Sequence, residues 1–123
     1  MKIDYTLYLV TDSHIVNRQE LYKRVEQAIL GGCTMVQLRE KDISSLDFYR
    51  QALELKQITE KYRVPLIIND RVDIALAVKA AGVHIGQNDI PVSVARDIIG
   101  RNMLLGVSVT SLNEAEQAVK DGA

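Results

Sequence analysis

The stretch Pro65-Leu66-Ile67-Ile68-Asn69-Asp70-Arg71 contains the pattern that decides the fold class of this chain. Proline disfavours helical backbone in the residue before it, so Val64 is expected to be extended and an apolar strand to follow. The strand runs into a polar turn, and a helical pattern begins at Val72. A buried strand, a polar turn and a helix in succession are typical of a parallel β/α protein.

The same unit recurs along the whole chain. Helical patterns separate the apolar runs, as a sheet built from βαβ crossovers requires. The predicted strands are Thr6–Val10, Thr34–Leu38, Leu66–Ile68, Val83–Ile85 and Met103–Val107.

Capping residues and glycines mark the helix ends. The predicted helices are one containing Leu21, Val25, Ala28 and Ile29, one at Leu46–Tyr62, one at Val72–Ala81 ended by Gly82, one between Pro91 and Gly100, and one from the Ser111/Glu114 capping box to Gly122. Asn17 and Glu20 have the spacing of a capping box before the first helix.

Two architectures fit this alternation: an open doubly wound sheet and a (β/α)8 TIM barrel. The first strand is followed by Thr11-Asp12-Ser13-His14, without the glycine-rich fingerprint of a dinucleotide fold. Polar residues after every strand favour the barrel, whose sites lie at that face. A barrel needs eight units and about 200 residues. We therefore expect residues 1–123 to be a single α/β domain, a truncated barrel of about five units, with a complete small open sheet as the alternative.

Composition limits the classes of function. The chain has 123 residues, is 47% hydrophobic and 25% charged, and has a net charge of −1. A near-neutral charge gives no electrostatic case for nucleic acid or an anionic membrane. No apolar run approaches a membrane span, and the first residues do not form a signal peptide. The single cysteine, Cys33, excludes a disulfide framework and fits a cytoplasmic setting.

Polar residues after neighbouring strands are the candidates for a site. Gln37, Arg39 and Lys41 alternate and would point to one side if the chain stayed extended, and arginine and lysine suit phosphate oxygens. Asp70 and Asp89 follow the third and fourth strands, and Mg²⁺ prefers one or two carboxylates together with phosphate oxygens.

Structural alternatives exist for each group. The cations could belong to a solvated loop, and Asp70 and Asp89 could cap the helices that follow them. Ser108 and Thr110 could hold an anion or simply form a capping turn before the last helix. His84, inside a strand, is best interpreted as a packed histidine.

Five ordered motifs resemble a known family: Tyr8-Leu-Val-Thr-Asp12, Val36-Gln-Leu-Arg-Glu-Lys41, Leu66-Ile-Ile-Asn-Asp-Arg71, Gly82-Val-His-Ile-Gly-Gln-Asn-Asp89 and Gly106-Val-Ser108. Together they resemble the thiamine phosphate synthases, also called thiamine-phosphate pyrophosphorylases. The resemblance implies a (β/α)8 barrel and a transferase of thiamine biosynthesis. The implied reaction joins hydroxymethylpyrimidine diphosphate to thiazole phosphate and releases diphosphate with Mg²⁺.

The resemblance also implies roles for individual residues. Gln37, Arg39, Lys41 and Asn69 would hold the pyrimidine diphosphate, Ser108 would contact the diphosphate or the pyrimidine, and Asp70 and Asp89 would bind Mg²⁺. No residue is assigned as a catalytic acid or base.

Part of the family pattern is missing from these residues. The further diphosphate lysine and the glycine-rich site for thiazole phosphate are not present, so this chain alone is expected to be incomplete. Two alternatives remain: a thiazole tautomerase-like enzyme, whose histidine would fall near Thr110, and an inactive fragment that self-associates through open sheet edges.

Overall fold

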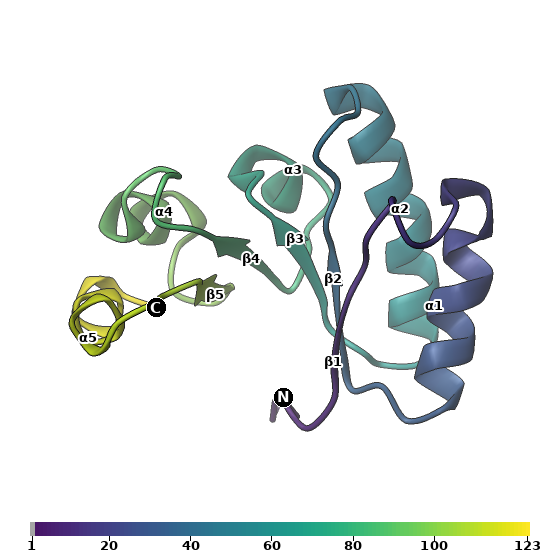
Figure 1. The fold of residues 1–123 in the computed structure, drawn as a ribbon, viewed down its shortest axis with the longest axis horizontal. Coiled ribbons are helices and arrows are strands. Elements are labelled where there is room, and N and C mark those ends of the chain that lie inside the picture. Colours follow the sequence, from purple (N-terminus) through teal and green to yellow (C-terminus); the bar gives the residue numbers. More distant parts are fainter. Residues whose placement is uncertain (1) are drawn as a thin grey trace.

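The computed structural model describes residues 2–123 and has the expected order of alternating strands and helices (Figure 1). The strands are β1 (Tyr8–Val10), β2 (Met35–Leu38), β3 (Leu66–Asn69), β4 (Gly82–Ile85) and β5 (Leu104–Val107). The helices are the short 3-10 helix η1 (Arg18–Glu20) and the α-helices α1 (Leu21–Leu30), α2 (Ser45–Lys61), α3 (Val72–Ala77), α4 (Val92–Ile99) and α5 (Leu112–Asp121).

The five strands form one parallel sheet in the order β1-β2-β3-β4-β5. Strand order therefore follows chain order without reversal. In a doubly wound sheet the order reverses at a switch point and helices cover both faces. Here the helices lie on one side of a curved sheet (Figure 1), so the doubly wound alternative is wrong.

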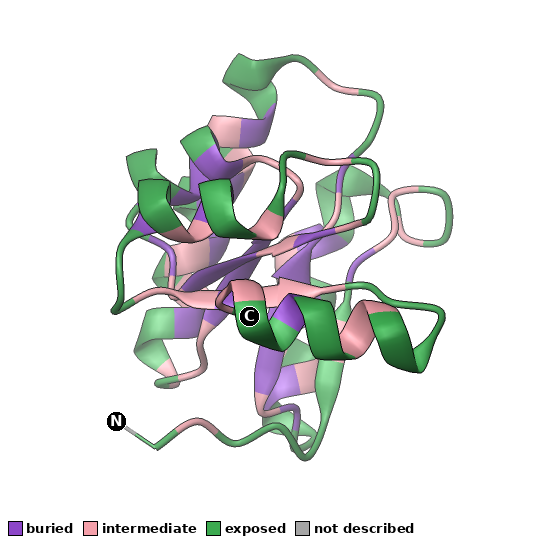
Figure 2. Ribbon diagram, turned by 90° about the vertical axis from the view of Figure 1, so that its left-hand side faces the viewer, coloured by how far each residue is buried: buried purple, intermediate pink, exposed green. Residues whose placement is uncertain are grey.

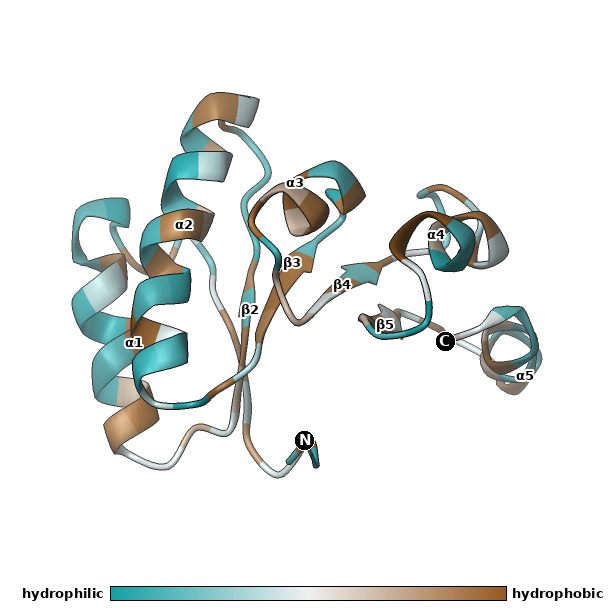
Figure 3. Cartoon of the chain, turned by 180° about the vertical axis from the view of Figure 1, so that it is seen from behind, coloured by the Kyte–Doolittle hydropathy of each residue, from teal (hydrophilic) through white to brown (hydrophobic). Residues whose placement is uncertain are grey.

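The hydrophobic core fills the space between the sheet and its helices. Strand side chains alternate, and those on the outer face, such as Val36, Ile68 and Val83, are fully buried against the helices. Phe48 and Leu55 of α2 enter the same cluster. Burial is concentrated in the strands and in the helix faces that meet them (Figure 2), and the apolar stripes of the helices follow this pattern (Figure 3).

Two details of the helices differ from the sequence prediction. Helix α3 ends at Ala77, not at Ala81, because the chain turns at Val78 and at Lys79, which has a positive φ, and Gly82 instead begins β4. The Asn17/Glu20 capping box does not form. Asn17 caps η1 by accepting from the Gln19 amide, and the Glu20 carboxylate pairs with Arg24.

The remaining helix ends lie within about one residue of the prediction. Of the Ser111/Glu114 capping box only one half forms: Ser111 accepts from the Glu114 amide, while the Glu114 carboxylate accepts from Thr110. Gly122 ends α5 in a left-handed conformation, and Gly100 ends α4. Among residues 2–123, no helix combines the length and the apolar character that a membrane crossing requires.

Candidate functional site

The carboxyl ends of the strands gather polar residues on the inner face of the sheet, opposite the helices. Parallel pairing places Asn69 of β3 beside His84 of β4, and His84 beside Gly106 of β5. Gln37 of β2 lies beside Ile67 on the same face. The inner face therefore carries an amide, an imidazole and a second amide where the outer face carries aliphatic side chains.

Asp70 connects the end of β3 to its neighbours on both sides. Its amide donates to the His84 carbonyl at 2.7 Å, and its carboxylate forms an ion pair with Nζ of Lys41. Its φ of 65° lies in the left-handed region, which non-glycine residues seldom adopt and which is often found at functional sites. Helix α3 has no side-chain cap, so the alternative that Asp70 caps this helix is wrong.

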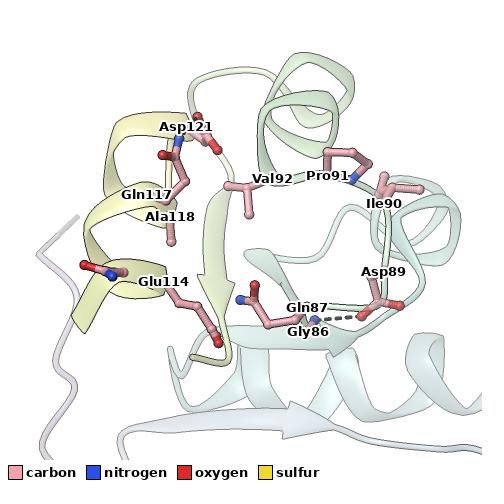
Figure 4. Close-up of a pocket in the computed structure, with 11 residues that line it drawn as sticks. Gly86, Gln87, Asp89, Ile90, Pro91, Val92, Glu114, Gln117, Ala118 and Asp121 are labelled. Atoms are coloured by element: carbon pink, nitrogen blue, oxygen red, sulfur yellow. Dashed lines mark hydrogen bonds between the residues drawn. The ribbon is translucent and has the colours of Figure 1, made fainter. Parts of the chain in front are cut away.

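Asp89 closes the turn that follows β4. Its Oδ2 accepts from the Gly86 amide at 2.7 Å, and among the described residues Oδ1 has no protein donor. Helix α4 begins at Pro91 without a side-chain cap, so Asp89 does not cap that helix either. Asp89 also borders a cleft of about 460 Å³ between the start of α4 and α5, to which Gln87 and Glu114 contribute (Figure 4).

Two buried amides line the inner face. Gln37 is 4% exposed and donates from Nε2 to the Tyr8 hydroxyl at 3.0 Å. Asn69 is 5% exposed, and its Nδ2 has no hydrogen-bond acceptor among residues 2–123. Leaving a buried amide unpaired costs about 1–3 kcal/mol, so Asn69 presents a donor that a ligand oxygen could satisfy.

Ser108 is fixed by three contacts with β4 and the turn after it. Its amide donates to Ile85 at 2.9 Å, its carbonyl accepts from Nε2 of Gln87 at 2.9 Å, and its hydroxyl lies 2.7 Å from Nε2 of His84. Ser108 therefore does not cap α5. Thr110 does take part in the start of that helix, because its hydroxyl donates to the Glu114 carboxylate.

His84 is packed, as the sequence predicts, but it also touches the site. Its ring lies against Gly106, where an added Cβ would be only 2.5 Å from Nδ1. Burial lowers the pKa of His84, while the nearby carboxylates of Asp70 and Asp89 act in the opposite direction. The Asp70 amide bond to the His84 carbonyl and the register of Asn69 with His84 place the ends of β3 and β4 side by side.

The loop after β2 carries the two cations. The Arg39 amide donates to the Thr11 hydroxyl at 3.0 Å, and its guanidinium makes no hydrogen bond or ion pair within residues 2–123. Lys41 reaches Asp70, as described above. Glu40, between them, is buried and receives two hydrogen bonds from Arg18. Sequence reasoning missed Thr11, Arg18 and Glu40, because contacts between two loops leave no periodic signal.

The donor set suits a hard cation held together with an anion. Residues 2–123 contain no group of three or more histidine, cysteine or acidic side chains that could enclose a metal. Mg²⁺ commonly needs only one or two carboxylates when phosphate oxygens and water complete its shell. Asp70 and Asp89 could supply those carboxylates, and Arg39 and Lys41 the positive charge for an anion.

These features define a class: a parallel β/α protein whose polar site lies at the carboxyl ends of its strands, as in the β/α-barrel enzymes. Comparison with known proteins identifies the family. A family model described as "Thiamine monophosphate synthase" matches residues 7–123. The chain belongs to the thiamine monophosphate synthase family.

Individual relatives agree with the family model. The thiamine-phosphate synthases of Clostridium beijerinckii and Ruminiclostridium cellulolyticum are 61% and 62% identical to this chain over 122 residues, which is 99% of the chain and 58% of each relative. The solved thiamine phosphate pyrophosphorylase from Pyrococcus furiosus superposes with a TM-score of 0.85 at 39% identity, covering 95% of this chain and 56% of that one. The chain thus spans somewhat less than three-fifths of the length of these relatives.

Proposed function

We propose that this chain provides the pyrimidine diphosphate and Mg²⁺ side of a thiamine-phosphate synthase, a transferase of thiamine biosynthesis. Its substrates would be hydroxymethylpyrimidine diphosphate and thiazole phosphate, and diphosphate would be released. The observation that supports this most directly is the meeting of Lys41, Asp70 and the His84–Ser108 pair at adjacent strand ends. The sequence relationship to thiamine-phosphate synthases points the same way.

We further propose that residues 1–123 form one domain, about five units of a (β/α)8 barrel. The sheet is singly wound with consecutive strand order, and its helices lie on one side only (Figure 1). The match to the Pyrococcus furiosus protein supports the same architecture. Cys33 is a buried free thiol, in keeping with the expected cytoplasmic setting.

Each residue would act on the diphosphate group in a way that follows from its chemistry. Arg39 would offer a planar fork to phosphate oxygens and Lys41 a mobile charge. Asn69 would donate from its unpaired Nδ2, and the buried Gln37 would fix the pyrimidine side of the site. Ser108, fixed by His84, would contact the diphosphate or the pyrimidine.

The role of the metal follows from the same chemistry. Asp70 and Asp89 would hold Mg²⁺. The bound ion would offset the negative charge that builds on the departing diphosphate. No side chain of this chain needs to act as a strong base, because the reaction depends on stabilising the leaving group.

Calorimetric titration of this chain with inorganic diphosphate, with and without Mg²⁺, tests the proposal. We expect binding that requires Mg²⁺. Asp89→Ala should weaken it by at least about 100-fold, since it removes a ligand of the charge-stabilising ion. Asp97→Ala, which changes an exposed aspartate on α4, is the matched control. Metal-independent binding, or equal affinity for both variants, would contradict the metal assignment.

We also propose that the chain associates with a second copy or a complementary segment through its sheet edges. Among residues 2–123, the end strand β1 pairs only with β2 and the end strand β5 only with β4, and unpaired strand edges recruit partners. Light scattering should report a species larger than the 13.8 kDa monomer. A monodisperse monomer at high concentration would contradict this.

A further inference from the structure

The loop that carries the cations is held by a part of the chain to which no role has been assigned. The cation loop, residues 39–42, follows β2, and the brace, residues 11–18, follows β1. The first contact between them is the hydrogen bond from the Arg39 amide to the Thr11 hydroxyl, at 3.0 Å. Thr11 is only 7% exposed and Arg39 is half-buried, so this bond is partly shielded from water at the start of the cation loop.

The second contact is an ion pair with unequal burial. Nε and Nη2 of Arg18 both donate to Oε2 of Glu40, at 3.1 and 3.0 Å. The Glu40 side chain is 2% exposed and that of Arg18 is 42% exposed. A carboxylate this deeply buried requires a charged partner, and in residues 2–123 that partner is Arg18.

A third, weaker contact extends the same pattern. Nε2 of His14 lies 4.0 Å from the Asp42 carboxylate, with both side chains largely exposed. Residues 39, 40 and 42 are thus all contacted from the brace, while Lys41 pairs with Asp70, which follows β3.

We propose that the brace, with Arg18 as its main positioning residue, sets the geometry and the charge of the anion site without touching the ligand. This inference rests on the proposed function. Two effects combine. The Thr11 hydroxyl accepts from the Arg39 amide and so holds the backbone at the start of the cation loop, and Arg18 holds the side chain of the next residue, Glu40. Arg18 also neutralises Glu40, which would otherwise place a negative charge between the two cations and repel an anion.

Four variants separate this role from general stability. Arg18→Gln removes the bidentate donor, Arg18→Lys keeps one charged donor, and Thr11→Val removes only the hydroxyl. Arg24→Gln is the control, because Arg24 has an exposed surface pair with Glu20. For each variant we would measure the affinity for inorganic diphosphate with Mg²⁺ and the hydrogen exchange of the amides at residues 39–42.

We expect Arg18→Gln and Thr11→Val to bind diphosphate about tenfold more weakly than the parent chain, because each loses a hydrogen bond that holds the cation loop. The affinity of Arg18→Lys should lie between that of Arg18→Gln and that of the parent chain. The cation-loop amides should exchange about tenfold faster in the same two variants, and Arg24→Gln should match the parent in both measurements. Unchanged affinity in folded Arg18→Gln and Thr11→Val, with binding intact in the parent, would overturn the inference and leave the proposed function standing.

Failure of the parent chain to bind diphosphate would instead count against the proposed function. Hydrogen exchange then decides on the brace alone: faster exchange at residues 39–42 in Thr11→Val supports it, and unchanged exchange overturns it. If Arg18→Gln does not fold, Thr11→Val, which leaves no unpaired charge, gives the decisive comparison.

Discussion

The two faces of the sheet differ in composition although the same strands form both. On the outer face, Val36, Ile68 and Val83 are fully buried against helices. On the inner face Asn69 lies in register with His84, and within residues 2–123 the Nδ2 atom of Asn69 has no hydrogen-bond partner. We therefore expect the helix-covered face to contribute more to stability, while the inner face keeps the Asn69 donor available for a ligand.

Neighbouring residues of β3 give the largest expected contrast. Ile68→Ala leaves a cavity in the core and should lower the free energy of unfolding by about 2–5 kcal/mol. Asn69→Ala removes an amide whose Nδ2 is already unpaired, so the loss should stay below about 1 kcal/mol. Urea denaturation measures both. Equal losses in the free energy of unfolding for the two variants would show that the outer face does not contribute more to stability than the inner face.

Gly106 tests how closely the inner face is packed. An added Cβ would lie 2.5 Å from Nδ1 of His84, so Gly106→Ala should destabilise the chain by about 1–3 kcal/mol. Removing the ring in Gly106→Ala/His84→Ala should recover part of that loss, because the two changes are coupled. If the double variant is as unstable as the sum of the single ones, the ring is not what requires glycine here.

Arg39→Lys tests the cations at the mouth of the inner face. A planar fork is replaced by a point charge, so affinity for diphosphate with Mg²⁺ should fall about tenfold, or about 1.4 kcal/mol, with little change in stability. Arg50→Lys, on an exposed part of α2, is the control in the same calorimetric titration. Equal affinities of the two variants would argue against a bidentate contact from Arg39.

The smallest effect concerns pH. Burial lowers the pKa of His84 below its ordinary value of 6.5 in the folded chain. The unfolded chain therefore binds the proton more readily, and stability should be fully present above about pH 6.5 and decline as the pH falls toward the folded pKa. His84→Asn should reduce this dependence. Urea midpoints measured across that range check it, and a rise in stability on acidification that depends on His84 would contradict it.

The sequence predicts the strands well because each is an apolar run bounded by polar turns. All five fall within about two residues of their predicted bounds. The end of α3 is missed because Val78 and Ala80 continue the apolar pattern although the chain has already turned. The turn is made by the positive φ of Lys79 and by hydrogen bonds from the Lys79 and Ala80 amides back to Leu76 and Ala75, which the hydrophobic pattern does not reveal.

The candidate site is only partly visible in the sequence. Its strand-end residues follow from topology, because parallel strands deliver them to one edge. Two ion pairs depend on loop conformations, which hydrophobic periodicity does not predict. They are the pair between Arg18 and Glu40 and the pair between Lys41 and Asp70. The charged sequence of residues 39–42 is also compatible with a solvated loop. The burial of Glu40 is visible only in the structure.

We expect a metal ion and diphosphate to bind together on the inner face, at the ends of β3 and β4. Mn²⁺, which takes the same oxygen ligands as Mg²⁺, is paramagnetic and broadens nearby amide resonances. With diphosphate present, Mn²⁺ should broaden the amides of Lys41, Asp70, Asp89 and Ser108 more strongly than that of Gly82, which lies at the opposite end of β4. Broadening that is strongest at Glu114 and Asp121, in the cleft beside α5, or equal broadening at all of these amides, would contradict binding at the ends of β3 and β4.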